Sequence, residues 1–429
     1  MRKIYFILTF LCFWGLAASS ALAQQFPKDT LQLTLAQAEK MFLNENLALI
    51  IQRYEVDQAK AEVITARLFE NPEFGFESNL YNPGDKRFFD YSSTGGQYAA
   101  QLSQLFLTAG KRNKNIQLAK ISVQLSENQF YDLLRTLRYA LRSNFYKIYF
   151  QQQSANVYHQ EISSLQQTLK VFEQQYLKGN IAQKELLRIK SQLYSLQAEL
   201  NELQQETEEV QAELKLLIRA RPTAYIVPEA PPYLDQKEIL SKLTYTQLLD
   251  SALNHRADLK IARTQVEYSA INQKLQQAMA IPDVTMSLSF DKKGNFIDNY
   301  SGIGISLPLP FFNRNQGAIK QAKIAVEASK AQLLNQQDLV ENEVAKSFNG
   351  ALRLENLYNS FDPKFREDFD HLINEVFKNY QKRNISLLEF LDFYSSYKEN
   401  ALQMNNLQLN RINSLEELNY VIGTQIFNQ

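Results

Sequence analysis

The residues best suited to chemistry are few in this chain and stand far apart. The three histidines are His159, His255 and His371. No two of them have the spacing that places a pair of metal ligands on one helix face, and the methionines are too scattered to relay copper. Gly302 and Gly304 lack the third glycine of a dinucleotide-binding turn. We therefore predict no catalytic residue, no metal site and no cofactor, and hence no enzyme.

The N-terminal segment has the features of an export signal. Two basic residues precede an apolar run over residues 4–16, and small residues follow at 21–23. The apolar run is shorter than the ~20 residues that a membrane-spanning helix needs, which favours a signal peptide at residues 1–23 over a membrane anchor. Cys12, the only cysteine, lies inside this segment. We expect the exported chain to carry neither disulfides nor thiol chemistry.

The charge balance excludes one class of partner. Lys and Arg total 46, as do Asp and Glu, so the exported chain is close to neutral. A protein that binds nucleic acid would carry a basic excess, and we therefore expect no nucleic-acid partner. No later stretch is both long and apolar enough to predict a membrane-spanning helix.

The chain contains an internal sequence repeat of two similar halves. Laying residue n on residue n + 210 aligns Pro72 with Pro282, and each proline ends a helical run and precedes an alternating segment. Nearer the end of each half, an offset of 204 aligns residues 176–187 with 380–391. A change in loop length explains the slip, because loops tolerate insertions. The predicted organisation is a first repeat at 24–218, a proline-rich linker at 219–243 and a second repeat at 244–429.

Several long stretches contain almost no glycine or proline. Residues 110–177 would form a helix about 100 Å long, and 34–70 with 181–218 would match its length end to end. The apolar residues of the segment 181–218 recur with a 3.5-residue period, which is typical of a left-handed coiled coil. The second half repeats this plan over 244–280, 317–381 and 385–422. The sequence therefore predicts a mainly α-helical rod.

Four segments alternate between apolar and polar or small residues. They are 73–80, 97–106, 283–290 and 302–309, and polar turn regions at 81–96 and 291–300 join them in pairs. A period of two predicts strands with one apolar face. The residues predicted to face lipid are Phe74, Phe76, Leu80, Tyr98, Leu102, Val284, Met286, Leu288, Ile303, Ile305 and Leu307.

An apolar outer face and a polar inner face are typical of an outer-membrane barrel. A soluble hairpin packed on the helices would also alternate, and that alternative stays open. A membrane barrel needs at least about 8 strands, because an open sheet edge in lipid leaves backbone groups unpaired. One chain offers only four such segments, so it would have to oligomerise to span a membrane.

The order of these elements resembles the TolC-like outer-membrane efflux family over essentially the whole exported chain. The resemblance implies a mainly α fold with a membrane β-barrel, in which three copies contribute four strands each to one 12-stranded barrel that a coiled-coil helical tunnel continues. The segments 70–78, 107–112 and 311–323 look most like the branch that serves heavy-metal cation pumps, the CusC/CzcC type.

The same resemblance implies a function and a location. The protein would be a homotrimeric exit duct in the outer-membrane lipid of a Gram-negative bacterium, with a large periplasmic part. Its partners would be a periplasmic adaptor (membrane fusion protein) and an inner-membrane pump of the RND type. Outlets for type I protein secretion or drug efflux share this fold and stay as alternatives. The non-channel alternative is a soluble coiled-coil periplasmic adaptor, which predicts a single helical hairpin flanked by small β-domains.

The resemblance also places the turns at 176–188 and 380–392 at the periplasmic tip of the tunnel. It implies that Glu389 and Asp392 constrict the entrance: they share a helix face, and a threefold axis would repeat them as two acidic rings that favour cations. The residues alone leave an ordinary solvated pair as the alternative. The other residues predicted for the tip turns and gate are Tyr176, Gly179, Glu185, Tyr380, Lys382 and Arg383, with salt bridges expected from Glu185 to Lys382 or Arg383.

Overall fold

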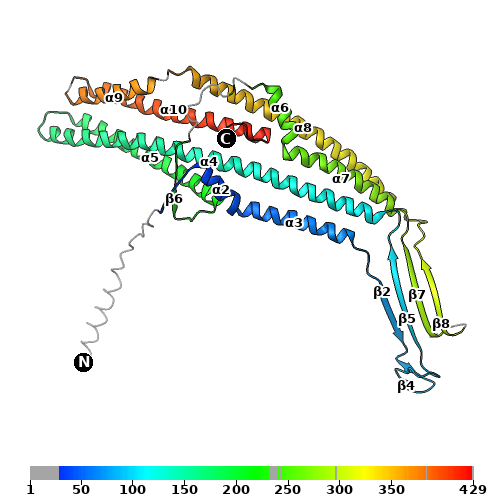
Figure 1. Ribbon diagram of the computed structural model, residues 1–429. Coiled ribbons are helices and arrows are strands. Elements are labelled where there is room, and N and C mark those ends of the chain that lie inside the picture. Colours follow the sequence, from blue (N-terminus) through cyan, green and yellow to red (C-terminus); the bar gives the residue numbers. More distant parts are fainter. Residues whose placement is uncertain are drawn as a thin grey trace, which may run out of the picture.

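The computed structural model describes residues 29–231, 240, 243–294, 297–362, 364–382 and 384–427. The predicted signal peptide at 1–23, part of the predicted linker and Arg383 lie outside these described residues. The chain forms an elongated bundle of helices, and a sheet projects from one end of it (Figure 1). This confirms the predicted mainly α fold with long helices and four paired strands.

The long helix α4 organises the bundle. The helices of the first half are α2 (Leu35–Glu45), α3 (Leu47–Arg67), α4 (Lys111–Leu177) and α5 (Gln183–Ile218). Those of the second half are α6 (Tyr245–His255), α7 (Ala257–Met279), α8 (Gln316–Ser360), α9 (Phe365–Gln381) and α10 (Leu387–Ile422). Figure 1 shows α3 and α5 end to end along α4, which also contacts α7 and α10, and α8 packs on both of these.

Both halves begin with the same local signal. Thr34 and Thr244 are the N-cap residues of α2 and α6, and each hydroxyl accepts a hydrogen bond from the backbone N–H of the glutamine three residues later. The side chains of Gln37 and Gln247 accept in return from the backbone N–H of the threonine, at 2.9 and 3.0 Å. This reciprocal capping box satisfies donors that a helix N-terminus leaves unpaired, so the two segments start their helices for the same reason.

Three helices that the sequence predicts as continuous are interrupted. The predicted helix 34–70 breaks at Asn46, where the backbone is extended with φ −65° and ψ 118°. The Asn46 side chain caps α3 by accepting from the Leu49 N–H at 3.1 Å, and it donates to the Leu217 carbonyl at 2.9 Å. The break is therefore fixed by a contact with the end of α5, which local sequence does not reveal.

The predicted helix 317–381 also stops early, because α8 ends at Ser360 and α9 begins at Phe365. The sequence carries Pro363 between them. A proline disfavours helical backbone at the residue before it, which is the signal that the prediction overlooked.

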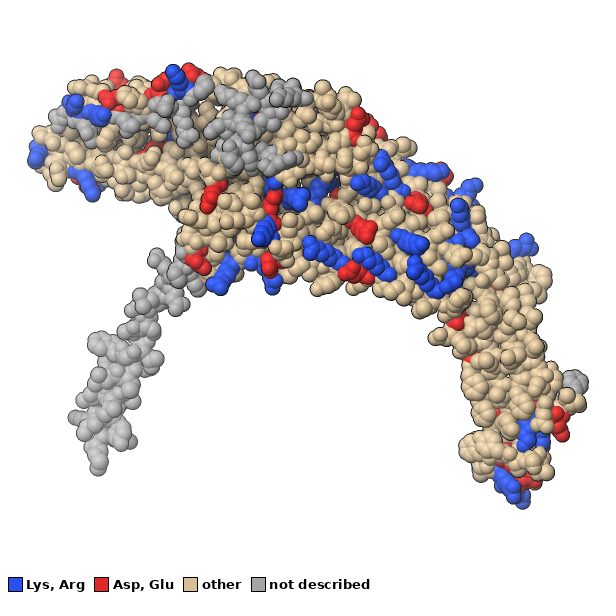
Figure 2. All heavy atoms as spheres, in the orientation of Figure 1, with Lys and Arg blue, Asp and Glu red and all other residues tan. Residues whose placement is uncertain are grey.

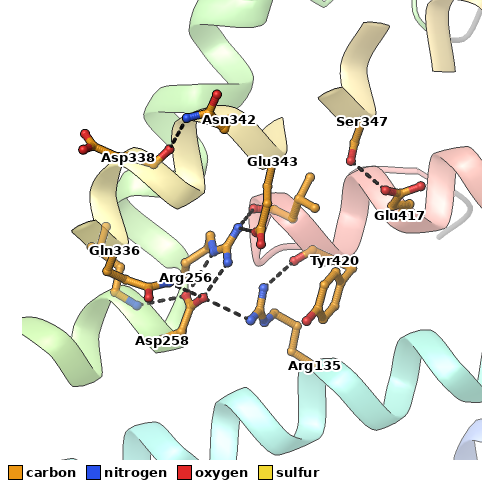
Figure 3. A network of polar contacts seen from close by, with 12 residues as sticks. Arg135, Arg256, Asp258, Gln336, Asp338, Asn342, Glu343, Ser347, Glu417 and Tyr420 are labelled. Atoms are coloured by element: carbon orange, nitrogen blue, oxygen red, sulfur yellow. Dashed lines mark hydrogen bonds and ion pairs between the residues drawn. The ribbon is translucent and has the colours of Figure 1, made fainter. Parts of the chain in front are cut away.

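The predicted helix 244–280 breaks at Arg256, which lies at the centre of a polar network (Figure 3). The buried guanidinium pairs with Asp258 and Glu343, both at 2.5 Å. Arg135 of α4 reaches Asp258 at 3.4 Å and donates to the Tyr420 carbonyl at 2.9 Å. Burial opposes ionisation, but the hydrogen bond from Arg256 and the charge of Arg135 hold the pKa of Asp258 below its ordinary value. The network thus joins α4, α7, α8 and α10 at one point.

The four predicted strands form one antiparallel sheet in the order β2-β5-β7-β8. They are β2 (Glu73–Ser78), β5 (Tyr98–Phe106), β7 (Val284–Lys293) and β8 (Asp298–Ser306). The β5–β7 pair joins the two halves of the chain, and β2 and β8 are the edges of the sheet. The predicted turn regions are partly wrong. β7 and β8 extend into 291–300, and β3 (Tyr81–Asn82) pairs with β4 (Arg87–Phe88) within 81–96.

The sequence analysis missed a short parallel pair between β1 (Asp29–Leu33) and β6 (Ala224–Pro228). Strands of five residues are too short to stand out by periodicity. The buried Gln211 of α5 holds β6 in place, because its amide donates to the Ile226 carbonyl at 2.7 Å and accepts from the Ile226 N–H at 3.0 Å. The first part of the predicted linker is therefore packed on the bundle.

The buried face of α5 follows the predicted 3.5-residue period. Its buried apolar residues include Leu186, Ile189, Leu193, Leu196, Leu200, Val210 and Leu214. In the middle of the bundle Val210 and Leu214 pack in one cluster with Phe145, whereas nearer the tip Leu193 and Leu196 share a cluster with Phe390 of α10. The coiled-coil pairing of α4 and α5 thus holds both the middle and the tip.

Candidate functional site

The tip of the bundle is built from two turns of similar design. Between α4 and α5, Gly179 adopts a left-handed conformation with φ 72°, as predicted for a helix end. The Asn180 N–H donates to the Gln175 carbonyl at 2.9 Å, and the Asn180 amide donates to the Gln175 side chain at 2.7 Å. Between α9 and α10, Asn384 makes the same two contacts with Asn379, at 2.9 and 3.1 Å. These asparagines set the tip turns, and the repeat alignment was the signal for them.

The two turns differ in how the returning helix starts. In α5 the N-cap residue is Ala182, which makes no side-chain cap. In α10 the hydroxyl of Ser386 accepts from the Glu389 N–H at 3.2 Å, while the Glu389 carboxylate accepts from the Ser386 N–H at 2.8 Å. Glu389 is therefore the acidic partner of a capping box. Hydrogen bonds from the Ser386 backbone and side chain hold its pKa below the ordinary value.

Glu389 and Asp392 are both exposed on the first turns of α10. Their spacing places them on the same face of the helix, about one turn apart. Glu389 thus has a local role in capping, whereas no such contact with a described residue is seen for Asp392. The two acidic rings stay a prediction, because they depend on neighbouring copies of the chain.

An aromatic cluster that the sequence analysis missed joins the two hairpins at the tip. Tyr380 is 8% exposed, and its ring stacks on Phe390 at 4.1 Å between centroids and on Phe172 of α4 at 5.9 Å. Phe390 also contacts Tyr394 at 4.6 Å. Burial and the charge of Glu185 raise the pKa of Tyr380. Tyr380 therefore packs α4 against α10, whereas its repeat partner Tyr176 is exposed.

Of the salt bridges expected at the gate, only the one between Glu185 and Lys382 falls within the described residues. In the part of the tip that the structure describes, Glu185 and Lys382 make no ion pair, and Arg383 lies outside the described residues. The ion pairs near the tip are instead Lys190–Glu173 and Lys378–Glu375, both at 2.8 Å. The first joins α5 to α4 within one hairpin, and the second lies within α9, so neither bridges the two turns at the tip.

The sheet presents one exposed apolar face. The strand register places Phe74, Leu102, Leu288 and Ile303 in one row across all four strands. Phe74 and Ile303 are 71% and 77% exposed, and Leu288 is 57% exposed. The next row on the opposite face is formed by Gly75, Gln101, Ser289 and Gly302. The predicted division into an apolar face and a small or polar face is therefore present.

Most of the remaining residues predicted to face lipid are also exposed, and the exceptions are Tyr98 and Val284. Phe76, Met286 and Ile305 are exposed on the strands, while Tyr98 and Val284 are half-buried. Leu80 and Leu307 are exposed but lie just beyond the ends of β2 and β8. Figure 2 shows charged side chains spread over the helices, whereas the sheet surface in this view is nearly free of them until its far end.

Within the described ranges, no three His, Cys, Asp or Glu side chains gather as metal ligands would. None of the described helices combines the length and the apolar character needed to cross a membrane.

The sequence profile of the family described as outer membrane efflux protein matches residues 40–218 and 248–424. No curated protein matches the chain in sequence.

Several solved structures have a similar fold. The CmeC outer membrane channel of Campylobacter jejuni matches with a TM-score of 0.72 at 15% identity, over 91% of this chain and 86% of that chain. The outer membrane protein VceC of Vibrio cholerae matches with a TM-score of 0.69 at 18% identity, over 91% and 96%. CusC, whose structures concern folding and transmembrane channel formation, matches with a TM-score of 0.73 at 16% identity, over 94% and 96%.

Proposed function

This chain belongs to the outer membrane efflux protein family, and we propose that three copies of it form a passive exit duct through the outer membrane. Membership places the chain in the outer membrane of a Gram-negative bacterium, with its helices in the periplasm. It also disfavours the soluble adaptor, for which a single helical hairpin is expected, because this chain has two tip turns and a strand pair in each half.

One observation carries the proposal. The sheet has an exposed apolar face, a small or polar face, and two edge strands, β2 and β8. Four strands cannot close a barrel, and an open edge in lipid leaves backbone groups without partners. Pairing β2 of one copy with β8 of the next removes every edge, and three copies give 12 strands, which lies within the range of membrane barrels.

The helices would continue the barrel as a tunnel, and the tip would meet a periplasmic adaptor and an inner-membrane pump of the RND type. Glu389 and Asp392 would then line the entrance as two acidic rings, which favour cations such as heavy-metal ions. The strings at residues 70–78, 107–112 and 311–323, which resemble the heavy-metal branch of the family, support a cation as the cargo.

The first test is the conductance of the purified protein in planar bilayers, with its oligomeric mass measured in detergent. Discrete channels from a trimer are the expected result. A monomer that never inserts would overturn the proposed duct, because the apolar face of the sheet would then have another partner.

A second test addresses the acidic rings. Glu389→Gln with Asp392→Asn removes both charges, and the capping box survives because glutamine already fills this role at Gln37 and Gln247. We expect the permeability ratio of K⁺ over Cl⁻ to fall roughly twofold or more. The matched control is the pair Glu206→Gln and Glu209→Gln, which has the same spacing on α5 away from the tip. Unchanged selectivity in the first variant would remove the ring assignment and leave the duct intact.

A further inference from the structure

A large cavity opens between α4, α8, α9 and α10, and Tyr394 of the tip cluster forms part of its wall. Its volume is about 1030 Å³. Its walls combine apolar and aromatic side chains, among them Phe369, Ile373, Tyr394 and Tyr397, with amide and hydroxyl groups. Small-molecule sites are typically about 300–1,000 Å³ and also combine apolar and aromatic surface with polar groups.

Glu161 of α4 lines this cavity, and its buried carboxyl group indicates that a ligand binds there. The residue is 4% exposed. Its Oε1 is fully enclosed without a hydrogen-bond partner, and the carboxylate makes no ion pair with any described residue. The nearby ammonium of Lys398 is already engaged with Glu199 at 2.8 Å. A buried carboxyl group without a partner is costly, so a native structure that keeps one needs an explanation.

We propose that this cavity binds an amphipathic organic cation, whose charged amine pairs with Glu161 and whose apolar body lies against the aromatic wall. A protonated amine supplies the hydrogen-bond donors and the positive charge that Glu161 lacks. The rings of Phe369 and Tyr397, which contact each other at 5.7 Å, offer faces that attract a cation.

A bare metal ion fits this cavity poorly. Metal ions in proteins are held by several oxygen, nitrogen or sulfur ligands. Among the described residues, no three acidic, histidine or cysteine side chains come together. The wall holds a single carboxylate, and its other groups are amides, hydroxyls, one histidine and apolar or aromatic side chains. This composition favours an organic cation over a metal.

The site also predicts how binding depends on pH. Burial raises the pKa of Glu161 to about 8, although the charge of Lys398 opposes the shift. The groups that face Glu161 are Tyr158 of α4, Glu199 of α5, and Tyr394 and Lys398 of α10, and burial raises the pKa of Tyr158 to about 12. At pH 7 about a tenth of Glu161 is ionised, so the affinity for a cation should rise about tenfold between pH 7 and pH 9.

The experiment uses the purified full-length protein in detergent and a fluorescent aromatic amine, dansylcadaverine. A saturable fluorescence increase is expected for the wild type, with affinity rising from pH 7 to pH 9. Neutral N-acetyl-dansylcadaverine should bind at least tenfold more weakly. Glu161→Gln should lose at least tenfold in affinity for the amine, whereas Glu206→Gln, which alters an exposed carboxylate of α5, should bind as the wild type does.

A second variant guards against a change in the fold. Ala401→Trp places a bulky ring in the cavity wall without touching the charge of Glu161, and it should also abolish binding. Circular dichroism and oligomeric mass must match the wild type for both variants. No saturable binding by the wild type, or equal binding by Glu161→Gln or by the neutral analogue, would overturn the site. These readouts need no conductance, so the site and the duct can fail independently.

Discussion

Glu161 is the residue whose burial has the clearest consequence for stability. Its pKa in the folded protein is about 8, raised by burial from an ordinary value of 4.5. The folded protein therefore disfavours the ionised form of Glu161. Because the unfolded chain ionises this group first, the free energy of unfolding falls as the pH rises from about 4.5 to 8. Glutamine at this position does not titrate. We expect Glu161→Gln to gain in melting temperature relative to the wild type as the pH increases from 5 to 9, without added ligand.

The measurement is thermal unfolding by circular dichroism in detergent at pH 5, 7 and 9. Glu206→Gln serves as the control, because an exposed carboxylate should shift the curve little at any pH. Parallel curves for Glu161→Gln and the wild type would show that the carboxyl group is better solvated than its enclosure indicates.

At the scale of single elements, the breaks in the helices depend on contacts that are distant in sequence. The break before α7 lies at its N-cap residue Arg256, whose guanidinium is held by Asp258 and by Glu343 of α8. Removing one partner of a buried ion pair leaves an uncompensated charge, which typically costs about 3–5 kcal/mol. We expect Arg256→Ala to lower the free energy of unfolding by an amount near that range, reduced because Glu343 is partly exposed.

Chemical denaturation in detergent would measure this loss. Lys274→Ala, at an exposed position on the same helix, is the matched control and should change stability by less than about 0.5 kcal/mol. An equal effect of the two substitutions would mean that the network in Figure 3 contributes no more than a surface charge.

Two glycines test the local design of the long helices. Gly179 has φ 72° at the tip turn, and apart from its two chain neighbours no described residue lies within 4 Å of the position a Cβ would take. Gly179→Ala should therefore cost only the backbone term of a left-handed alanine, about 1–2 kcal/mol. Gly350 lies inside α8 with equally open surroundings, and Gly350→Ala should gain about 1 kcal/mol. Unfolding midpoints that move in the same direction for both variants would contradict this account.

The helices and turns differ in how well they could be predicted from the sequence. The absence of glycine and proline predicted α4 almost to the residue, and the 3.5-residue period together with the same absence predicted α5, because these signals are local. The breaks at Asn46 and Arg256 could not be read in the same way, since each depends on a partner more than 80 residues away. At the tip, the turn at Gly179 could be predicted from the glycine itself. The stacking of Tyr380 on Phe390 and Phe172 could not, because it depends on how the two hairpins pack together.

At the scale of the whole molecule, the sheet must be understood as part of an assembly. Alternation in the sequence predicted which side chains share a face, and the register of β2, β5, β7 and β8 bears this out. It could not predict how β2 and β8 are covered, because their partners belong to other copies in the proposed duct. The exposed apolar face and the helical tunnel are thus two consequences of one proposed assembly.

Neighbouring residues of β7 allow a direct test of which face meets lipid. Leu288 belongs to the apolar row and Ser289 to the polar row, and both lie between β5 and β8, so neither alters an edge strand. A lysine on the lipid face near the middle of the membrane costs about 2–4 kcal/mol, whereas one that faces the lumen is solvated. We expect Leu288→Lys to fold poorly into lipid vesicles, as measured by protection from protease, and Ser289→Lys to insert normally with reduced cation conductance. If both variants inserted equally well, the apolar face would not be in contact with lipid, and the sheet would have to pack on protein instead.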